Sequence, residues 1–281
     1  MFRKSLLFFL VLSISSFPAL TAKGSPASLT ASQIVEKNIA ARGGLQAWRG
    51  VQTLSWSGKL DAGAGDSIER SRHYAAGKLS PTSRPAAGPT KPAQQVQLPF
   101  VYEMKRGRKS RMEIEFAGKT AVQVYDGQNG WKYRPFLNRN DVEPFTDDEL
   151  KSEAGKSDLD GYLVDYAAKG TRIDLEGTER VEGHDAYKLK LTERDGRVQY
   201  VWVDAQSFLD VKVSGTPRHM DGKMHNVVVY QRDFRNVQGL MIPFVLETAV
   251  DGYRETHKVN IEKVEVNPKL ADSLFTKPQS K

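Results

Sequence analysis

The chain has 281 residues, a formal net charge of +7 and no cysteine. The absence of cysteine excludes disulfides, and it excludes the acylated cysteine by which bacterial lipoproteins are anchored. A basic excess of this size fits ordinary solubility or a surface that faces anionic lipid headgroups.

The first residues have the pattern of a secretory signal. Arg3 and Lys4 form a short positive region, residues 5–17 are largely apolar, and small residues follow. We expect a signal peptide over residues 1–22, with cleavage after Ala22 or Ala27; the alternative is a helix of the core. An exported protein rarely meets nucleic acid. We therefore expect a soluble periplasmic chain that is not lipid-anchored and has no nucleic-acid partner.

The stretch after the signal predicts two short helices, or one helix with a break. Thr30 or Ser32 can cap the start, and Gly43-Gly44 interrupts an intermittent apolar face. Residues 51–60 then have the β-branched and aromatic content of a strand.

Alternation of apolar and polar residues predicts the next strands. Even-numbered residues are apolar between residues 97 and 105, and the same pattern resumes over residues 111–116. Asp126-Gly127 marks the turn of a further hairpin. The predicted apolar face of the first two strands carries Phe100, Tyr102, Met104, Met112, Ile114 and Phe116.

The middle of the chain predicts two helices. Residues 146–149 (TDDE) fit a capping box at the start of the first. The second is expected to begin at Ser157 and to stop at Gly170, with one apolar face. That face carries Leu159, Tyr162, Leu163 and Tyr166.

From Arg172 onward the sequence predicts a meander of strands punctuated by Asp-Gly turns. About ten strands with short helices indicate a mainly β (α+β) protein, built as one antiparallel sheet or open barrel with helices on one side. We expect one domain over residues 28–278. Within it, residues 77–95 carry four prolines and little to bury, which predicts a flexible insertion.

The sequence offers few groups for catalysis. It has no nucleophile elbow, no HExxH motif and no glycine-rich phosphate loop, so we expect no enzymatic activity and no cofactor. One candidate metal site is HMDGKMH (219–225), where a turn could bring His219 near His225 beside two methionines, a ligand set that suits copper. An ordinary hairpin explains the same residues, and we favour it over a metal.

Arg106 continues the even-numbered apolar series after Met104. A guanidinium on an apolar face is costly unless it is paired or solvated. Three explanations stay open. The strand ends at Met104 and leaves Arg106 in a turn with Gly107, or Arg106 pairs with a buried carboxylate, or the face lines a ligand cavity.

Four motifs follow one another along the chain: MKRGRKSRMEIE (104–115), VYDGQNGWKYRPF (124–136), GLMIPF (239–244) and DSLFTKP (272–278). In this order they resemble motifs of the outer-membrane lipoprotein carriers, the LolA/LolB superfamily. The first two are similar to a strand ending in Lys-Arg-Pro and the hairpin after it, and the last two to a late strand and the C-terminal signature. Gly107 stands where the superfamily has proline.

The resemblance implies a half-open antiparallel β-barrel with short helices that form a lid over an apolar cavity. It also implies a LolA-like carrier that shuttles an acylated lipoprotein or another lipid toward the outer membrane. The expected partners are an inner-membrane donor complex and an outer-membrane acceptor, with only transient membrane contact. Alternatives are a periplasmic lipid or lipoprotein sensor that regulates a membrane signalling partner, and a secreted enzyme.

The resemblance also implies site residues. The matching arginine of the carriers lines the cavity and helps to control the lid, which assigns that role to Arg106. The expected cavity lining is completed by Phe100, Tyr102, Met104, Met112, Ile114, Phe116, Trp131 and Tyr133. The expected lid helices carry Leu159, Tyr162, Leu163 and Tyr166.

Overall fold

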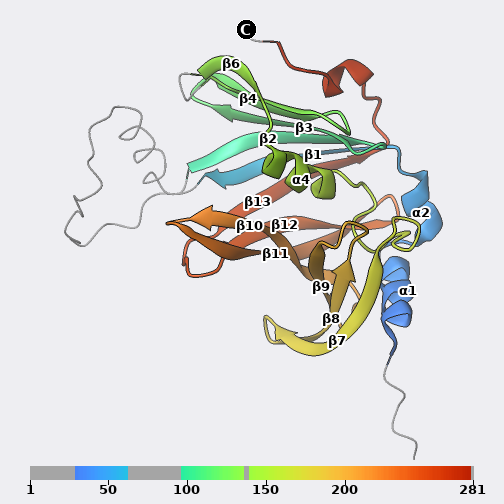
Figure 1. Ribbon diagram of the computed structural model, residues 1–281. Helices are drawn as coiled ribbons and strands as arrows, with labels where there is room; N and C mark the ends of the chain where they lie inside the picture. The colour runs from blue at the N-terminus through green and yellow to red at the C-terminus, as the bar shows by residue number, and fades with distance from the viewer. Residues whose placement is uncertain (1–28, 63–95, 136–138, 280–281) are drawn as a thin grey trace, which may run out of the picture.

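The computed structural model describes residues 29–62, 96–135 and 139–279. These residues form one antiparallel sheet of 13 strands, in the order β6-β5-β4-β3-β2-β1-β13-β12-β11-β10-β9-β8-β7. The sheet curves and is not closed, because β6 and β7 are its two free edges (Figure 1). The prediction of a mainly β, open antiparallel fold is confirmed.

The strands, in chain order, are β1 (Thr53–Ala62), β2 (Val96–Lys105), β3 (Lys109–Phe116), β4 (Lys119–Tyr125), β5 (Gly130–Arg134), β6 (Arg139–Pro144), β7 (Arg172–Val181), β8 (His184–Thr192), β9 (Val198–Asp204), β10 (Asp210–Met220), β11 (Lys223–Val237), β12 (Leu240–Val250) and β13 (His257–Val266). The helices are α1 (Ala31–Ala41), α2 (Leu45–Gly50), α4 (Asp147–Lys156) and the 3-10 helix η2 (Asp272–Phe275). The expected number of about ten strands was too low. Edge strand β6 (RNDVEP) and edge strand β7 (RIDLEGTERV) are rich in charge, which weakens the hydrophobic alternation of a strand.

Local signals explain where the helices begin. The Thr30 side chain accepts a hydrogen bond from the backbone of Gln33, whose side chain binds Thr30 in return, and the same capping box starts α4 at Thr146. The first helix ends before Gly43, where φ is +113° and a Cβ would collide with the carbonyl oxygen of Gly239. The predicted pair of short helices is confirmed.

The predicted helix over residues 157–170 is wrong. This stretch is a series of turns, which we call the lid segment. Gly161, Asp165 and Gly170 have φ values of +73°, +52° and +78°, which a right-handed helix cannot contain. Of the predicted apolar face, Leu159 and Leu163 are buried, and Tyr162 and Tyr166 are half-buried.

Most of the core lies on the concave face of the sheet, and a smaller cluster of Val122, Val124 and Tyr133 lies on the other face. The register pairs Phe100 with Ile114 and Tyr102 with Met112, so the predicted apolar face of β2 and β3 is confirmed. One core cluster joins α1 to β8 and β9 through Ile34, Val35 and Leu189. A second joins α2 to the lid segment and to β1, β2 and β12. In Figure 1, α1 and α2 lie at one end of the sheet and α4 crosses its middle.

The opposite, convex face of β3 is covered by the end of the chain. Phe275 of η2 is buried, and Arg111 Nη1 donates a hydrogen bond to the carbonyl oxygen of Leu274 at 3.2 Å. Lys105 and Lys109 both form ion pairs with Asp272. Residues 272–275 therefore give β3 and its neighbours a second packed side.

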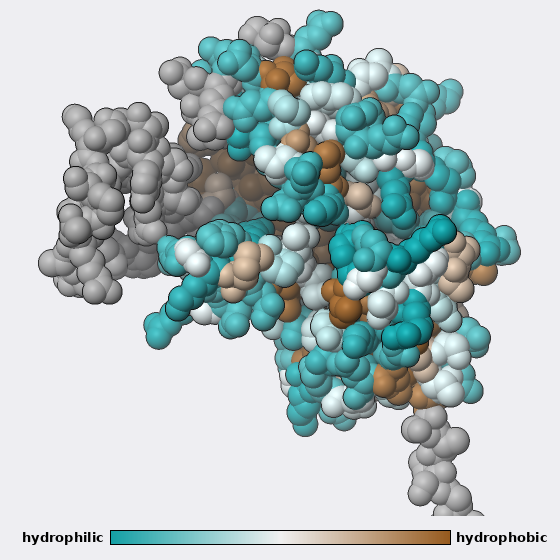
Figure 2. Space-filling view, in the orientation of Figure 1, coloured by the Kyte–Doolittle hydropathy of each residue, from teal (hydrophilic) through white to brown (hydrophobic). Residues whose placement is uncertain are grey.

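The face of the molecule shown in Figure 2 is largely hydrophilic, and hydrophobic side chains show on it mostly as small, separated groups. Across the described ranges, no helix combines the length and the apolar character that crossing a bilayer requires. The expected signal peptide (1–22), its cleavage sites at Ala22 and Ala27, and the expected insertion (77–95) lie outside the described residues.

Candidate functional site: an apolar cavity under a pinned lid

A cavity of about 420 Å³ lies between the concave face of the sheet and the lid segment. Its walls come from β1 to β4, β10 to β13, α2, α4 and the lid segment. Among the residues expected to line it, the structure brings Phe100, Tyr102, Met104 and Met112 to the lining, and two residues expected on the lid, Leu159 and Tyr162, line it as well. The sequence did not single out Trp48, Trp56, Ile242 and Leu246, which line it too.

Four other expected residues lie on the same side of the sheet or on the lid but outside the lining. Ile114 packs against the cluster around Phe100, and Phe116 is the last residue of β3. Leu163 and Tyr166 pack onto the core cluster that joins α1 to the sheet. Ile114, Leu163 and Tyr166 thus support the cavity walls instead of facing the space.

Trp131 and Tyr133 lie on the convex face. Register pairs them with Val124 and Val122, whereas Lys132, between them, points to the concave face and binds Glu149 of α4 at 2.6 Å. Trp131 lines a separate hollow beside η2, so the expected cavity role of these two aromatic residues does not fit their positions.

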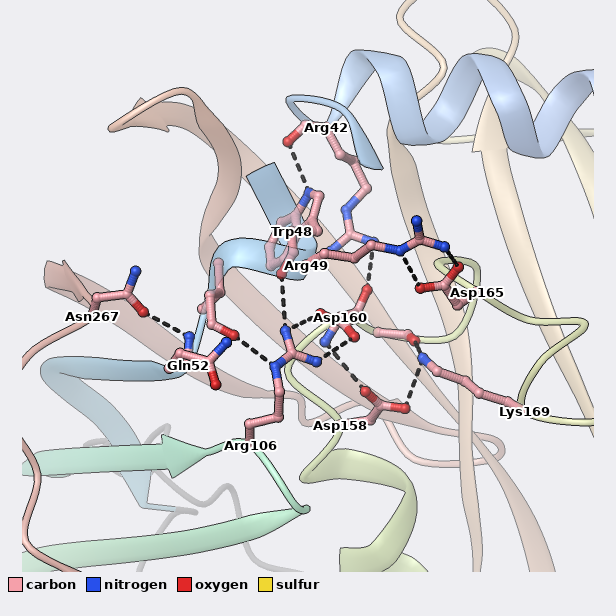
Figure 3. Close-up of polar contacts among 12 residues, drawn as sticks. Arg42, Trp48, Arg49, Gln52, Arg106, Asp158, Asp160, Asp165, Lys169 and Asn267 are labelled. Atoms are coloured by element: carbon pink, nitrogen blue, oxygen red, sulfur yellow. Dashed lines mark hydrogen bonds and ion pairs between the residues drawn. The ribbon is translucent and has the colours of Figure 1, made fainter. Parts of the chain in front are cut away.

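Arg106 lies just beyond the end of β2, in the turn before β3. Its Nη1 and Nη2 each donate a hydrogen bond of 2.9 Å to one carboxylate oxygen of Asp160 in the lid segment (Figure 3). Its Nε and Nη2 also donate to the carbonyl oxygens of Val51 and Trp48, at 2.8 and 2.9 Å. The turn explanation and the buried-carboxylate explanation are therefore both correct, and the cavity lining does not include Arg106.

This bidentate pair is partly shielded from water. The Asp160 side chain is 7% exposed and the Arg106 side chain 35% exposed. Hydrogen bonding to Asp160 raises the pKa of Arg106, which stays charged at any physiological pH. Asp160 was missed in the sequence, where it was interpreted as part of a helix start. The signal in the sequence was Arg106 itself, because a guanidinium in line with an apolar face needs a partner such as a buried carboxylate.

A second ion pair joins the lid segment to α2, and another lies within the lid segment itself. Arg49 of α2 binds Asp165 in a second bidentate pair, at 2.6 and 3.0 Å, whereas Lys169 and Asp158, 2.8 Å apart, both belong to the lid segment (Figure 3). Arg42 stacks 4.3 Å from the ring centre of Trp48 and donates to the carbonyl oxygen of Asp160. The lid segment is thus attached by polar contacts around an apolar underside.

Helix α4 closes the cavity next to the lid segment. Glu153 accepts hydrogen bonds from Tyr102 and Ser110, and Ser157 contacts both Glu153 and Ser110. Burial, and next the charge of Glu153, raise the pKa of Tyr102 well above its usual value. Burial raises the pKa of Tyr162 to about 12. Both phenols are therefore neutral at the cavity, and the Tyr102 hydroxyl donates to Glu153.

The HMDGKMH hairpin does not bring its histidines together. Register pairs His219 with Met224 and Arg218 with His225, so the two imidazoles point to opposite faces. His225 Nδ1 lies 2.9 Å from the carbonyl oxygen of Asp251 and its ring packs edge-on against Tyr253. Within the described part of the chain, no group of three or more His, Asp or Glu residues could hold a metal ion.

No family model and no curated protein matches this sequence. Solved structures do match. A LolA superfamily protein from Nitrosomonas europaea is 15% identical, with a TM-score of 0.53 over 89% of this chain and 99% of that one. A DUF1329 family protein from Desulfovibrio piger is 12% identical, with a TM-score of 0.55 over 89% and 98%.

A third match is a domain from Vibrio parahaemolyticus that is named for outer membrane lipoprotein sorting. It is 12% identical, with a TM-score of 0.52 over 87% of this chain and 95% of that one. Identities this low establish a shared architecture and no more. The curved, open antiparallel sheet of this chain has the LolA-like fold.

Proposed function

We propose that this protein is a periplasmic carrier that binds an acyl chain in the apolar cavity and shuttles it toward the outer membrane. The observation that carries the proposal is a cavity lined largely by apolar side chains under a lid segment that a bidentate Arg106–Asp160 pair holds shut. The LolA-like fold and the signal-like first residues support it. The cargo is a lipoprotein or another acylated lipid, and no cofactor is required.

The cavity volume fits one acyl chain. A 150 Å³ apolar cavity holds benzene, so about 25 Å³ serves each carbon, and 420 Å³ holds about 17 carbons. Burial of about 0.8 kcal/mol per methylene gives a chain of this length about 14 kcal/mol of gross affinity. Several fully buried chains would approach the ceiling of non-covalent affinity and would not be released. A carrier therefore needs a lid that opens.

Opening the lid requires separation of Arg106 from Asp160. The arginine sits on the sheet side and the carboxylate on the lid segment, so this contact joins the two halves that must part. An inner-membrane donor and an outer-membrane acceptor would each favour the open state, with only transient contact between this protein and either membrane.

Substitution Arg106→Leu tests the role of this contact. We expect the variant to keep the fold, because β2 and β3 remain paired, but to lose control over cargo uptake or release. The measurement is transfer of a fluorescent fatty acid from the loaded protein to acceptor vesicles. Identification of co-purified lipids by mass spectrometry provides the parallel test of cargo. Unchanged transfer by the variant would show that Arg106 has no such role, and a protein that neither carries nor takes up lipid would refute the carrier.

A further inference from the structure

A second hollow, of about 350 Å³, adjoins the cavity at the lid segment. The two spaces share Asp158 and Tyr162, so the lid segment forms a wall of both. The other walls of this hollow come from the turn between β2 and β3, the C-terminal part of α4, and the turn between β8 and β9. We call it the basic hollow.

The acidic residues of the basic hollow are already paired. Lys169 Nζ lies 2.8 Å from Asp158. Arg197 lies 2.6 Å from Asp195 and 2.7 Å from Glu193. These are the three carboxylates that line the hollow, so each has a cation in contact.

Two arginines of the basic hollow have no such partner. Arg108 and Arg194 are exposed and line the hollow, and neither forms an ion pair or hydrogen bond with another described residue. Arg108 also has φ of +61°, a conformation that a bulky side chain rarely adopts and that is often kept where function requires it. On the cavity side, Lys156 is likewise exposed and has no ion pair within the described ranges. Positive charge thus remains unneutralised beside the cavity.

We propose that the basic hollow binds the headgroup of a single-chain anionic amphiphile whose acyl chain occupies the cavity. This inference rests on the proposed acyl-chain function and narrows its cargo. A guanidinium presents a planar fork of donors that matches the oxygens of a carboxylate or a phosphate. Arg108 and Arg194 supply two such forks, and the cavity has room for about one chain. Fatty acids and lysophospholipids with a terminal phosphate combine both features.

A matched pair of ligands tests the headgroup. 1-Palmitoylglycerol and its 3-phosphate have the same chain and differ in charge, and calorimetry measures the binding of each below its micelle concentration. We expect the full-length protein to bind the phosphate about tenfold more tightly, as two partly exposed ion pairs allow. In Arg108→Gln/Arg194→Gln the preference should fall to about twofold or less, with the affinity for the neutral ligand unchanged. The preference should also decline with rising salt.

The matched control is Arg218→Gln/Arg254→Gln. These two arginines are also exposed and have no ion-pair partner among the described residues, but they lie outside both spaces, so the control should keep the full preference.

Each other outcome overturns a different statement. The headgroup site would be refuted if the unmodified protein bound the two ligands with equal affinity. It would also be refuted if the double variant lost affinity for both ligands equally. Binding of inorganic phosphate as tight as that of the lipid would make the hollow a free-anion site. If the Arg108→Gln/Arg194→Gln substitutions weakened only the adhesion of the protein to anionic vesicles, the basic hollow would be a membrane contact. Failure to bind either ligand would refute the proposed function itself.

Discussion

Removal of the negative charge at Asp160 should both destabilise the protein and loosen the lid. In Asp160→Asn, the Arg106 guanidinium loses its bidentate carboxylate and keeps the carbonyl oxygens of Val51 and Trp48. Breaking a fully buried ion pair costs about 3–5 kcal/mol, and water reaches the 35% exposed arginine, so we expect a loss of about 2 kcal/mol. The lid segment should also release cargo faster, because this contact joins it to the sheet.

Urea unfolding and the rate of cargo transfer to vesicles measure the two effects. Asp165→Asn is the matched control, since it breaks the other bidentate pair of the lid segment. Its partner Arg49 is 49% exposed, so the control should lose less free energy of unfolding than Asp160→Asn. If the two variants lose the same free energy of unfolding, burial does not set the strength of the Arg106–Asp160 pair, and our reasoning fails.

Two further changes have defined outcomes. Gly43→Ala should lower the free energy of unfolding by about 2 kcal/mol, because a Cβ there meets the Gly239 carbonyl. The control is Gly44→Ala, where φ is +93° but the space is open, and it should lower the free energy of unfolding by about 1 kcal/mol. Equal decreases in the two variants would exclude the collision. The second change is a fall in pH. Lys105 and Lys109 donate hydrogen bonds to Asp272 and lower its pKa. The stabilisation of η2 by these ion pairs is therefore fully present above about pH 3.9, the pKa of an aspartate in the unfolded chain, and is lost as pH falls through the lowered pKa. The protection of the amides of residues 272–275 against hydrogen exchange, measured relative to the intrinsic exchange rate at each pH, should fall below that pH. In Asp272→Asn this protection should be low at every pH, and an unaltered pH profile in that variant would exclude this carboxylate.

The parts predicted from sequence are those set by neighbouring residues. Alternation over residues 97–105 and 111–116 placed Phe100, Tyr102 and Met112 on one face, because the period of a strand is two whatever it packs against. The capping box at Thr146 placed the start of α4, because capping joins residues three apart.

The parts missed depend on distant residues. Strand β5 is covered on both sides, by α4 at Lys132 and by the chain end near Trp131 and Tyr133, so its own alternation cannot show which face is concave. Asp160 meets Arg106 across 54 residues of sequence, and no local pattern marks that contact. The lid segment failed as a helix because Gly161 and Asp165 reverse the backbone within an apolar spacing that suited one.

The free edges of the sheet have a consequence for how the molecule can deform. In a closed barrel, every gain in circumference would break a ladder of backbone hydrogen bonds, whereas no ladder joins β6 to β7 here. Unpaired edges also invite other strands, and both are guarded: β6 ends in Pro144, and β7 has a bulge after Leu175 and a surface Arg172–Asp174 pair. The circumference of the curved sheet can therefore change with the volume that the cavity encloses, while the two guarded edges resist pairing with strands of other molecules.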